Sequence, residues 1–395
     1  MNRLPDRRGR IIHTNKPLSE MGKLAMKTHF SSVAVIGLGL IGSSFAAMYR
    51  NAYPDARLVG IDVSEDAVKA AQERGWIDEG HVSSEDLGSV LCGCELVMIA
   101  TPVPVANEYF RIIAACDFKG VVTDACSTKK IVSRQAQELL RYPEKYIPGH
   151  PMAGSEKNGF ANSKAHLIEN AYYILTPSAK VSEEKINAYR NFVSSLKALP
   201  IVLDYRQHDC ITGTISHLPH IIASTLVNFV RDTDTKEELM KALAAGGFKD
   251  ITRIASSSPV MWQQICLKNG KNISHILGQY IEALIQAKLS IDTEDENALY
   301  TLFESSRDYR NSMPNTSAGP IKKQFAVYCD IIDETGGIAT IATILASNNI
   351  SIKNIGIIHN REFEEGVLRI EFYDESSSSK ASALLKKYRY IVYEV

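Results

Sequence analysis

Short apolar runs alternate with longer stretches of helical periodicity in the first half of the chain. The runs are rich in β-branched residues, as buried strands are. Amphipathic segments separate them, which is typical of βαβ units with right-handed crossovers and helices on both sheet faces. The parallel strands that we expect are 33–36, 58–61, 96–100, 121–123 and 172–175. Residues 31–178 are therefore predicted to form an α/β domain with a Rossmann-like, doubly wound parallel sheet.

Helical periodicity dominates beyond residue 178. Only residues 201–203 still resemble a strand, and the helices that we expect are 183–198, 207–230, 236–245, 269–287 and 293–310. The most apolar stretch, 211–230, is interrupted by His217, Pro219 and His220, which favours a buried helix over a membrane span. All-helical domains of this size commonly bury their apolar stripes against a second copy. Residues 179–311 are therefore predicted to form a helical dimerisation domain.

A third domain is predicted after a break rich in proline, glycine and small polar residues, which marks a linker at 312–322. Beyond it, the apolar patterns indicate strands at 325–331, 351–359, 367–373 and 390–394 and helices at 337–347 and 379–388. This order, βαββαβ, is that of a ferredoxin-like domain, predicted over 323–395.

The composition narrows the possible partners. The chain has 395 residues with 44 Lys and Arg against 45 Asp and Glu, so it lacks the net charge that would hold nucleic acid or a membrane surface. Its seven cysteines are scattered without the paired spacing of a zinc site, which fits a reducing cytosol. Residues 1–30 are basic without an apolar run, so we expect a flexible tail, with organelle targeting as the alternative.

A glycine motif marks the expected cofactor site. The first strand runs into Gly37, Gly39 and Gly42, with Leu40 and Ile41 between the last two, and a helix follows. The first glycine permits a tight turn, the second lets the backbone approach a pyrophosphate, and the third lets helix and strand pack closely. The helix N-terminus adds free N–H donors. This arrangement predicts a dinucleotide site.

Asp62 indicates which dinucleotide binds. It ends the second strand about twenty residues beyond the motif, where a carboxylate accepts hydrogen bonds from the ribose hydroxyls. A carboxylate repels a 2′-phosphate, and Val63 and Ser64 offer no arginine to hold one, so we predict NAD rather than NADP. The alternative is that Asp62 only caps the next helix.

Two further loops fall at carboxyl ends of strands, where open α/β sheets bind ligands. Thr101 and Pro102 follow the third expected strand, and Ser127 follows the fourth. We expect both loops to line the nicotinamide half of the cleft. Ser127 alternatively serves only to cap the helix that begins near Lys129.

The segment 149–157 (GHPMAGSEK) carries the expected general base. A histidine with a pKa near neutrality can accept the proton of an alcohol while a hydride leaves the carbinol carbon. His150 lies in this turn-rich segment, which apolar packing does not require. A single histidine is more often a surface or satisfied core residue, so the neighbouring motifs decide the interpretation.

Further motifs complete a pattern: HD at 208–209, SHLPH at 216–220 and GGFKDITRIA at 246–255. With the glycine motif and GHPMAGSEK, they make residues 31–310 resemble the prephenate and arogenate dehydrogenase family. The resemblance implies that His150 hydrogen-bonds the C4 hydroxyl of prephenate, that Ser127 orients His150 and the hydroxyl, and that Arg253 binds a substrate carboxylate. It further implies substrate contacts from His217, His220, Ser155 and Lys249, with support from Asp209 and Asp250.

Physical chemistry agrees with these implied roles. Prephenate is a dianion, and a planar guanidinium grips a carboxylate through two hydrogen bonds where lysine offers a point charge. His217 and His220 could alternatively hold a metal, but a metal site needs further ligands, and we predict none. Trp262 either packs in the core or closes over the cleft.

The C-terminal segment, through residues 330–338 and 352–355, resembles an ACT domain, a module that senses amino acids. The resemblance implies that an effector binds at the turn containing Gly336 and Gly337, and we expect tyrosine or phenylalanine to inhibit there. The alternative is a dimerisation domain without an effector. The resulting hypothesis is an NAD-dependent prephenate dehydrogenase that forms 4-hydroxyphenylpyruvate in tyrosine biosynthesis. An arogenate dehydrogenase and a non-catalytic NAD-binding amino-acid sensor are the alternatives.

Overall fold

The computed structural model divides the chain into two compact units, 1–319 and 320–395. It describes residues 29–83, 86–154, 159–313, 325–330, 336–358 and 367–393. All but two residues of the expected N-terminal tail, and most of the expected linker, lie outside the described residues.

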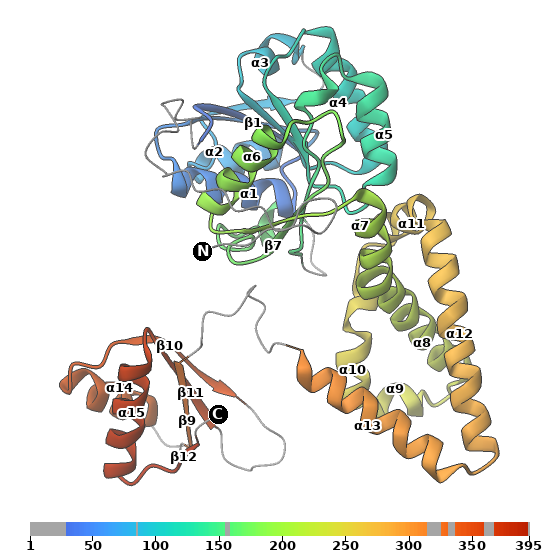
Figure 1. The fold of residues 1–395 in the computed structure, drawn as a ribbon, viewed down its shortest axis with the longest axis vertical. Helices are drawn as coiled ribbons and strands as arrows, with labels where there is room; N and C mark the ends of the chain where they lie inside the picture. Colours follow the sequence, from blue (N-terminus) through green and yellow to red (C-terminus); the bar gives the residue numbers. More distant parts are fainter. Residues whose placement is uncertain are drawn as a thin grey trace, which may run out of the picture. The chain divides into compact units, whose positions relative to one another are not determined.

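A five-stranded parallel sheet forms the centre of the first unit (Figure 1). Its order is β3-β2-β1-β4-β5, comprising Glu79–Val82, Arg57–Asp62, Ser32–Ile36, Leu96–Ile99 and Val121–Asp124. The order reverses between β1 and β4, which opens a crevice at their carboxyl ends. The helices that connect these strands are α1 (Leu40–Ala52), α2 (Glu65–Glu73), α3 (Gly88–Cys92), α4 (Val103–Ala115) and α5 (Lys130–Leu139). The doubly wound sheet expected from the sequence is confirmed.

The sheet is buried on both faces because successive side chains of its strands enter two separate cores. In β1, Val33 and Val35 join one core while Ala34 and Ile36 join the other, and all four are fully buried. This explains the continuous apolar runs of the central strands. The edge strand β3 is only half-buried and carries no such run, so the sequence pattern did not predict it.

A second, three-stranded sheet corrects one expectation. Its order is β6-β7-β8, comprising Gly149–Pro151, Tyr172–Leu175 and Leu199–Val202. The expectation that 172–175 joins the parallel sheet is wrong, because β7 runs antiparallel to β6 and parallel to β8. Between β7 and β8, helix α6 (Glu183–Ser195) buries Tyr189, Phe192 and Val193 in the first core. Packing thus places α6 and β8 with the nucleotide-binding domain, beyond the boundary expected at 178.

The rest of the first unit is helical. Helix α7 (Tyr205–Thr212) begins with a capping box between Asp204 and Gln207, then passes through one π-helical turn, Gly213–His217, into α8 (Leu218–Thr233). A 3-10 turn, Arg253–Ser256, follows helix α10 (Gly246–Thr252). The remaining helices are α9 (Leu239–Leu243), α11 (Pro259–Lys268), α12 (Gly270–Asp292) and α13 (Glu296–Ser312).

The apolar stretch at 211–230 is not the buried helix that we expected. Tyr205–Thr233 is long and apolar enough to cross a membrane by length and composition, yet only 28% of its most apolar window is buried in the protomer. Ile215 and Phe229 are exposed, as are Leu284 and Leu289 on α12. Polar His208, Asp209 and His217 within Tyr205–Thr233 are buried, so in the protomer this segment buries polar side chains while it exposes apolar ones.

The C-terminal unit is a four-stranded antiparallel sheet with two helices. Its strands are β9 (Phe325–Asp330), β10 (Ile352–Ile358), β11 (Val367–Phe372) and β12 (Val392–Tyr393), in the order β10-β11-β9-β12. Helices α14 (Gly337–Ser347) and α15 (Glu375–Lys387) complete a core around Ile341, Leu368 and Leu385. The βαββαβ order and the strand arrangement are ferredoxin-like, as predicted.

Candidate active site

The glycine turn after β1 has the geometry that a dinucleotide requires. Gly37 adopts φ +93°, and a Cβ there would lie 2.7 Å from the carbonyl oxygen of Ala100. A Cβ on Gly42 would lie 1.9 Å from the carbonyl oxygen of Gly37, so strand and helix pack too closely for any side chain. Beside Gly39, in contrast, the space within 4 Å of such a Cβ is empty. The turn therefore leaves room at Gly39 for a pyrophosphate to approach the backbone.

Asp62 links two loops at the carboxyl end of β2. Its Oδ2 accepts the N–H of Leu38 at 2.6 Å and its Oδ1 accepts that of Ser64 at 2.9 Å. The cap of α2 is Ser64, whose Oγ accepts the N–H of Ala67, so capping by Asp62 itself is not observed. The carboxylate is held beside the glycine turn, where it fits the ribose hydroxyls of NAD.

Replacing Asp62 with asparagine is expected to reduce the preference for NAD over NADP about tenfold, since a single charge repelling the 2′-phosphate is removed. Kinetic titration with both cofactors measures kcat/KM for each. Asp66→Asn, in the first turn of α2, is the matched control for a lost surface charge. An unchanged ratio of the two kcat/KM values in Asp62→Asn would contradict this assignment.

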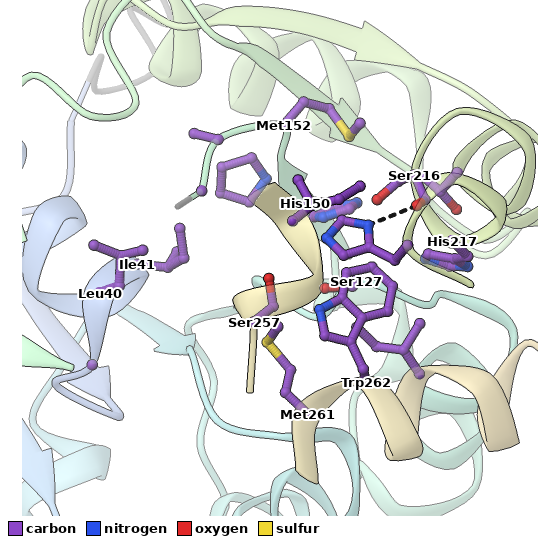
Figure 2. A pocket seen from close by; sticks show the side chains of 18 of the residues that line it. Leu40, Ile41, Ser127, His150, Met152, Ser216, His217, Ser257, Met261 and Trp262 are labelled. Atoms are coloured by element: carbon purple, nitrogen blue, oxygen red, sulfur yellow. Dashed lines mark hydrogen bonds between the residues drawn. The ribbon is translucent and has the colours of Figure 1, made fainter. Parts of the chain in front are cut away.

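A cavity of about 540 Å³ opens beside the glycine turn, where the sheet meets the helical region. Gly39, Leu40, Ile41 and Ala100 line its cofactor side. A neighbouring cavity of about 200 Å³ contains Thr101, Pro102 and Ser127 and shares Ile41 with the first. Figure 2 shows His150, Ser127 and Trp262 turned toward the same space. The loops expected at the nicotinamide half of the cleft are thus brought together.

His150 is the first member of a chain of hydrogen-bonded side chains. Its Nδ1 lies 2.8 Å from Nε2 of His208, and Nδ1 of His208 lies 2.8 Å from Oδ1 of Asp209. The backbone N–H groups of Lys129 and Lys130 donate to the two oxygens of Asp209 at 2.7 and 2.9 Å. This series of hydrogen bonds, here called the relay, joins β6, α7 and the start of α5. It therefore holds His150 in place through contacts with both the nucleotide-binding domain and the helical region.

The relay determines which nitrogen of His150 can act as a base. The carboxylate of Asp209 only accepts, so Nδ1 of His208 must donate and its Nε2 must accept. Nδ1 of His150 then donates to His208, which leaves the lone pair of its Nε2 available to a substrate. A carboxylate acting through a second imidazole therefore selects the tautomer of the base.

The surroundings keep these groups in the required charge states. Burial, and then electrostatic interactions with His208, Lys129 and His217, lower the pKa of His150 well below its usual value. Burial likewise lowers the pKa of His208. For Asp209, burial opposes ionisation, but the hydrogen bonds from His208 and two backbone amides together lower the pKa of the carboxyl. At neutral pH, both imidazoles are neutral and the carboxylate is charged.

A buried ion pair positions the segment that carries His150. Lys129 and Asp124 are fully buried, and the Lys129 ammonium donates to the Asp124 carboxylate and to the carbonyl of Gly149. The hydroxyl of Tyr146 donates to the other oxygen of Asp124 at 2.6 Å. A buried charge without its partner is strongly destabilising, so the Lys129 ammonium keeps its bonds to Asp124 and to the carbonyl of Gly149. These bonds hold Gly149, and hence its neighbour His150, in place.

The helical region supplies the opposite wall. His217 is buried, with Nδ1 3.1 Å from Nδ2 of Asn269, and burial lowers its pKa to about 4. His220 is bonded through Nδ1 to the carbonyl of Ser216 at 2.8 Å and stacks on Trp262 at 3.6 Å between centroids. Arg253 also lines the cavity, from the 3-10 turn after α10. The described lining of the cavity thus combines three imidazoles, those of His150, His217 and His220, with the guanidinium of Arg253.

Not every expected site residue reaches the cavity. Lys249 and Asp250 are exposed on α10 and are not among its lining residues. Ser155 lies outside the described residues. Ser127 lines both cavities, but Nδ1 of His150 is held by His208, so orientation of His150 by Ser127 stays a prediction. Across the described residues, no group of three or more His, Cys, Asp or Glu could hold a metal.

Three residues were not assigned to the site from the sequence. His208 was visible only as half of an HD pair, and Asn269 and Lys129 lie in no motif. Trp262, whose role was open, lines the cavity, and its buried Nε1 has no partner among the described groups. The available signal for His208 was its position next to Asp209 in the sequence. That signal was insufficient, because the role of the pair depends on the contact between His208 and His150, which appears only in the structure.

A Rossmann-like domain, a carboxylate beside the glycine turn and a half-buried imidazole in the adjoining cavity define a dinucleotide-dependent dehydrogenase. Family models agree: residues 45–202 match "Prephenate dehydrogenase, nucleotide-binding domain" and residues 204–305 match "Prephenate dehydrogenase, dimerization domain". The chain belongs to the prephenate dehydrogenase family.

Individual relatives support the same conclusion. The prephenate dehydrogenase of Bacillus subtilis (strain 168) is 36% identical over 357 residues, covering 90% of this chain and 95% of the relative. That of Lactococcus lactis subsp. cremoris (strain MG1363) is 35% identical, covering 90% and 97%. A crystal structure of the A. aeolicus enzyme, in complex with hydroxyphenyl propionate and NAD+, has a TM-score of 0.67 at 28% identity, covering 72% of this chain and 98% of that one.

Proposed function

We propose that the chain catalyses the NAD-dependent oxidative decarboxylation of prephenate to 4-hydroxyphenylpyruvate, a step toward tyrosine. The observation that carries the proposal is that His150 and Arg253, 103 positions apart in sequence by their numbers, line one cavity next to the glycine turn. The base and the carboxylate anchor thus meet beside the cofactor position.

The residues divide the work by their chemistry. Arg253 binds a carboxylate of the dianionic substrate and orients C4 toward the nicotinamide side. Nε2 of His150 accepts the proton of the C4 hydroxyl, and the charge that develops on the imidazole is stabilised through His208 by Asp209. NAD+, held at the turn of Gly37, Gly39 and Gly42, would supply the acceptor for the hydride that leaves C4. Loss of the ring carboxylate as carbon dioxide then produces an aromatic ring, which supplies much of the driving force.

The decisive experiment is a spectrophotometric assay for NADH with prephenate, repeated with arogenate. We expect turnover with prephenate to exceed that with arogenate. The reverse preference would establish the arogenate enzyme, and the absence of NADH with either substrate would favour a non-catalytic sensor. An imidazole backed by His208 and Asp209, together with an arginine in the same cavity as that imidazole, argues against the sensor.

Replacing Arg253 with glutamine is expected to raise KM for prephenate about thirtyfold with a smaller change in kcat, because a charge-assisted contact made in both ground and transition states is lost. Steady-state kinetics over a wide substrate range measures both constants. Arg231→Gln, an exposed arginine at the end of α8, is the matched control. A fall confined to kcat would contradict the assigned role.

We further infer that the chain forms a homodimer through its helical region. Support comes from the exposed apolar side chains on α8, α12 and α13, among them Phe229, Leu289 and Phe303. Apolar surface of this extent is uncommon on monomers. The chain has a mass of 43.7 kDa, and sedimentation equilibrium is expected to give twice that mass.

A cytosolic location also remains a prediction, which fractionation of cells would test.

Regulation by an aromatic amino acid is the remaining part of the proposal. Gly336 adopts φ +93° immediately before α14, a conformation that favours glycine and exposes backbone N–H groups at the helix start. We expect tyrosine or phenylalanine to bind at Gly336 and Gly337 and to inhibit the reaction. Activity titrated with both amino acids, in the full chain and in a chain ending at Met313, tests this. Equal inhibition of both forms would exclude the C-terminal unit as the sensor.

A further inference from the structure

A second large cavity lies at the amino ends of the parallel strands, whereas the active site lies at their carboxyl ends. Its volume is about 580 Å³. Phe30 and Glu95 stand just before β1 and β4, Val121 begins β5, and α6 forms one wall. The catalytic cavity lies at the carboxyl ends of these strands, so nothing in the reaction uses this space. We call it the basal cavity, lined by His29, Phe30, Cys94, Glu95, Lys119, Gly120, Val121, Lys145, Ile147, Lys185, Ala188, Tyr189 and Phe192.

The interior of the basal cavity is apolar and aromatic. Ile147, Tyr189 and Phe192 are almost fully buried beneath it. The rings of Phe30 and Phe192 meet edge to face with their centroids 5.0 Å apart. A concave site of several hundred Å³ with aromatic walls suits a flat apolar body, because ring faces and edges stack on one another favourably.

The lining of the basal cavity carries an excess of positive charge. Its charged side chains include three lysines and one acid, Glu95. Lys119 is paired with Asp117 at 3.5 Å, and Oε2 of Glu95 already accepts the N–H of Ser31 at 2.7 Å, so the excess charge is that of Lys145 and Lys185. The ammonium of Lys145 donates to the carbonyl of Lys119, and that of Lys185 lies 3.5 Å from the carbonyl of Glu144. Among the described residues, no carboxylate lies within ion-pair distance of Lys145 or Lys185. Both ammonium groups can therefore bind an anion at the rim.

We propose that the basal cavity binds a small organic anion with an aromatic body, an aromatic carboxylate. The apolar interior takes the ring, and Lys145 and Lys185 take the carboxylate. The chain's own first 28 residues are a poorer occupant, because they carry seven Lys and Arg against two Asp and Glu and would be repelled by the lysines. This site is separate from the dehydrogenase chemistry and does not depend on it.

The test uses the fluorescent aromatic anion 8-anilinonaphthalene-1-sulfonate as probe. It is titrated into the full-length Arg253→Gln enzyme saturated with NAD+, which weakens anion binding in the catalytic cavity. Adding Lys145→Met and Lys185→Met is expected to weaken binding about tenfold, equivalent to about 1.4 kcal/mol. The matched control adds Lys69→Met and Lys180→Met, two exposed lysines outside the lining, and should leave binding unchanged. Methionine keeps the apolar stem, so folding should be preserved.

Competition then tests the chemistry of the ligand. 3-Phenylpropionate should displace the lysine-dependent fraction of the probe at a concentration at least tenfold lower than its neutral analogue 3-phenylpropanamide. Equal displacement by both compounds, or unchanged probe binding in the Lys145 and Lys185 double variant, would overturn the proposal. A crystal structure with residues 1–28 occupying the basal cavity would also overturn it.

Discussion

Replacing His150 with asparagine is expected to lower kcat about a thousandfold, while KM for prephenate changes by less than about threefold. Asparagine keeps a hydrogen-bonding group near the C4 hydroxyl, so binding is largely retained, but it cannot accept the proton. Steady-state kinetics at saturating NAD+ separates the two constants. The effect is large because, of the three histidines that line the cavity, His150 is the one bonded to His208 and thereby held as the base.

The matched control for this prediction is His166→Asn, at an exposed histidine that is not among the lining residues of the cavity. It should retain full activity. Circular dichroism and thermal melting of both variants establish that folding is intact. If His150→Asn instead raised KM and left kcat unchanged, the residue would be a substrate anchor rather than the base, and the division of roles with Arg253 would be reversed.

Sequence alone was sufficient where structure depends on contiguous residues. The turn at Gly37, the close packing at Gly42 and the carboxylate at Asp62 each follow from a local steric or electrostatic requirement, and the structure shows all three geometries. The βαββαβ unit was predictable for the same reason, since each strand and helix has its own period. Helix α14 was predicted with the bounds that the structure gives.

Sequence failed where an element depends on distant partners. Strand β6 has only three residues, Gly149–Pro151, and is a strand only because β7 pairs with it. Helix α6 has an ordinary amphipathic pattern that does not say which core receives it. For α8, the apolar pattern was identified correctly, but the prediction that the helix is buried was wrong. Apolar side chains such as Phe229 remain exposed in the protomer, and no local pattern says whether a partner covers them. These are properties of tertiary and quaternary packing.

The same distinction applies to the active site. The motifs supplied His150, Arg253 and His217, whose residue types indicate their chemistry. The contact between His150 and His208 spans 58 positions in sequence, and no local pattern encodes it. The family resemblance implies an orienting role for Ser127, which stays a prediction. In the structure, Nδ1 of His150 is bonded to the imidazole of His208, which in turn is bonded to the carboxylate of Asp209.

The relay also predicts how activity depends on pH. His150 must be neutral to accept a proton, and its pKa is lowered, mainly by burial. Activity governed by this group is therefore lost only as pH falls below the lowered value. We expect the acid limb of the kcat/KM profile to lie below pH 6.5, the usual value for histidine, with no loss between about pH 6.5 and 8.

Replacing Asp209 with asparagine is expected to lower kcat about a hundredfold and to shift this acid limb to lower pH. Oδ1 of Asp209 accepts two donors, His208 and the Lys129 amide, so the amide oxygen of asparagine should take that position and preserve the tautomer. The negative charge is lost, however. Because the carboxylate raises the pKa of His208, its removal makes both imidazoles harder to protonate and His150 a weaker base.

The shift of the acid limb distinguishes this mechanism from simple misfolding. In Asp209→Asn, the new NH2 group faces the N–H of Lys130, which should cost about 1–3 kcal/mol of stability. A purely structural defect would reduce the amplitude of the pH profile without moving it. Asp204→Asn, which keeps the cap at the exposed start of α7, is the matched control and should alter neither. An acid limb that stays in place in Asp209→Asn would show that the carboxylate only holds the fold and that its charge does not reach the base.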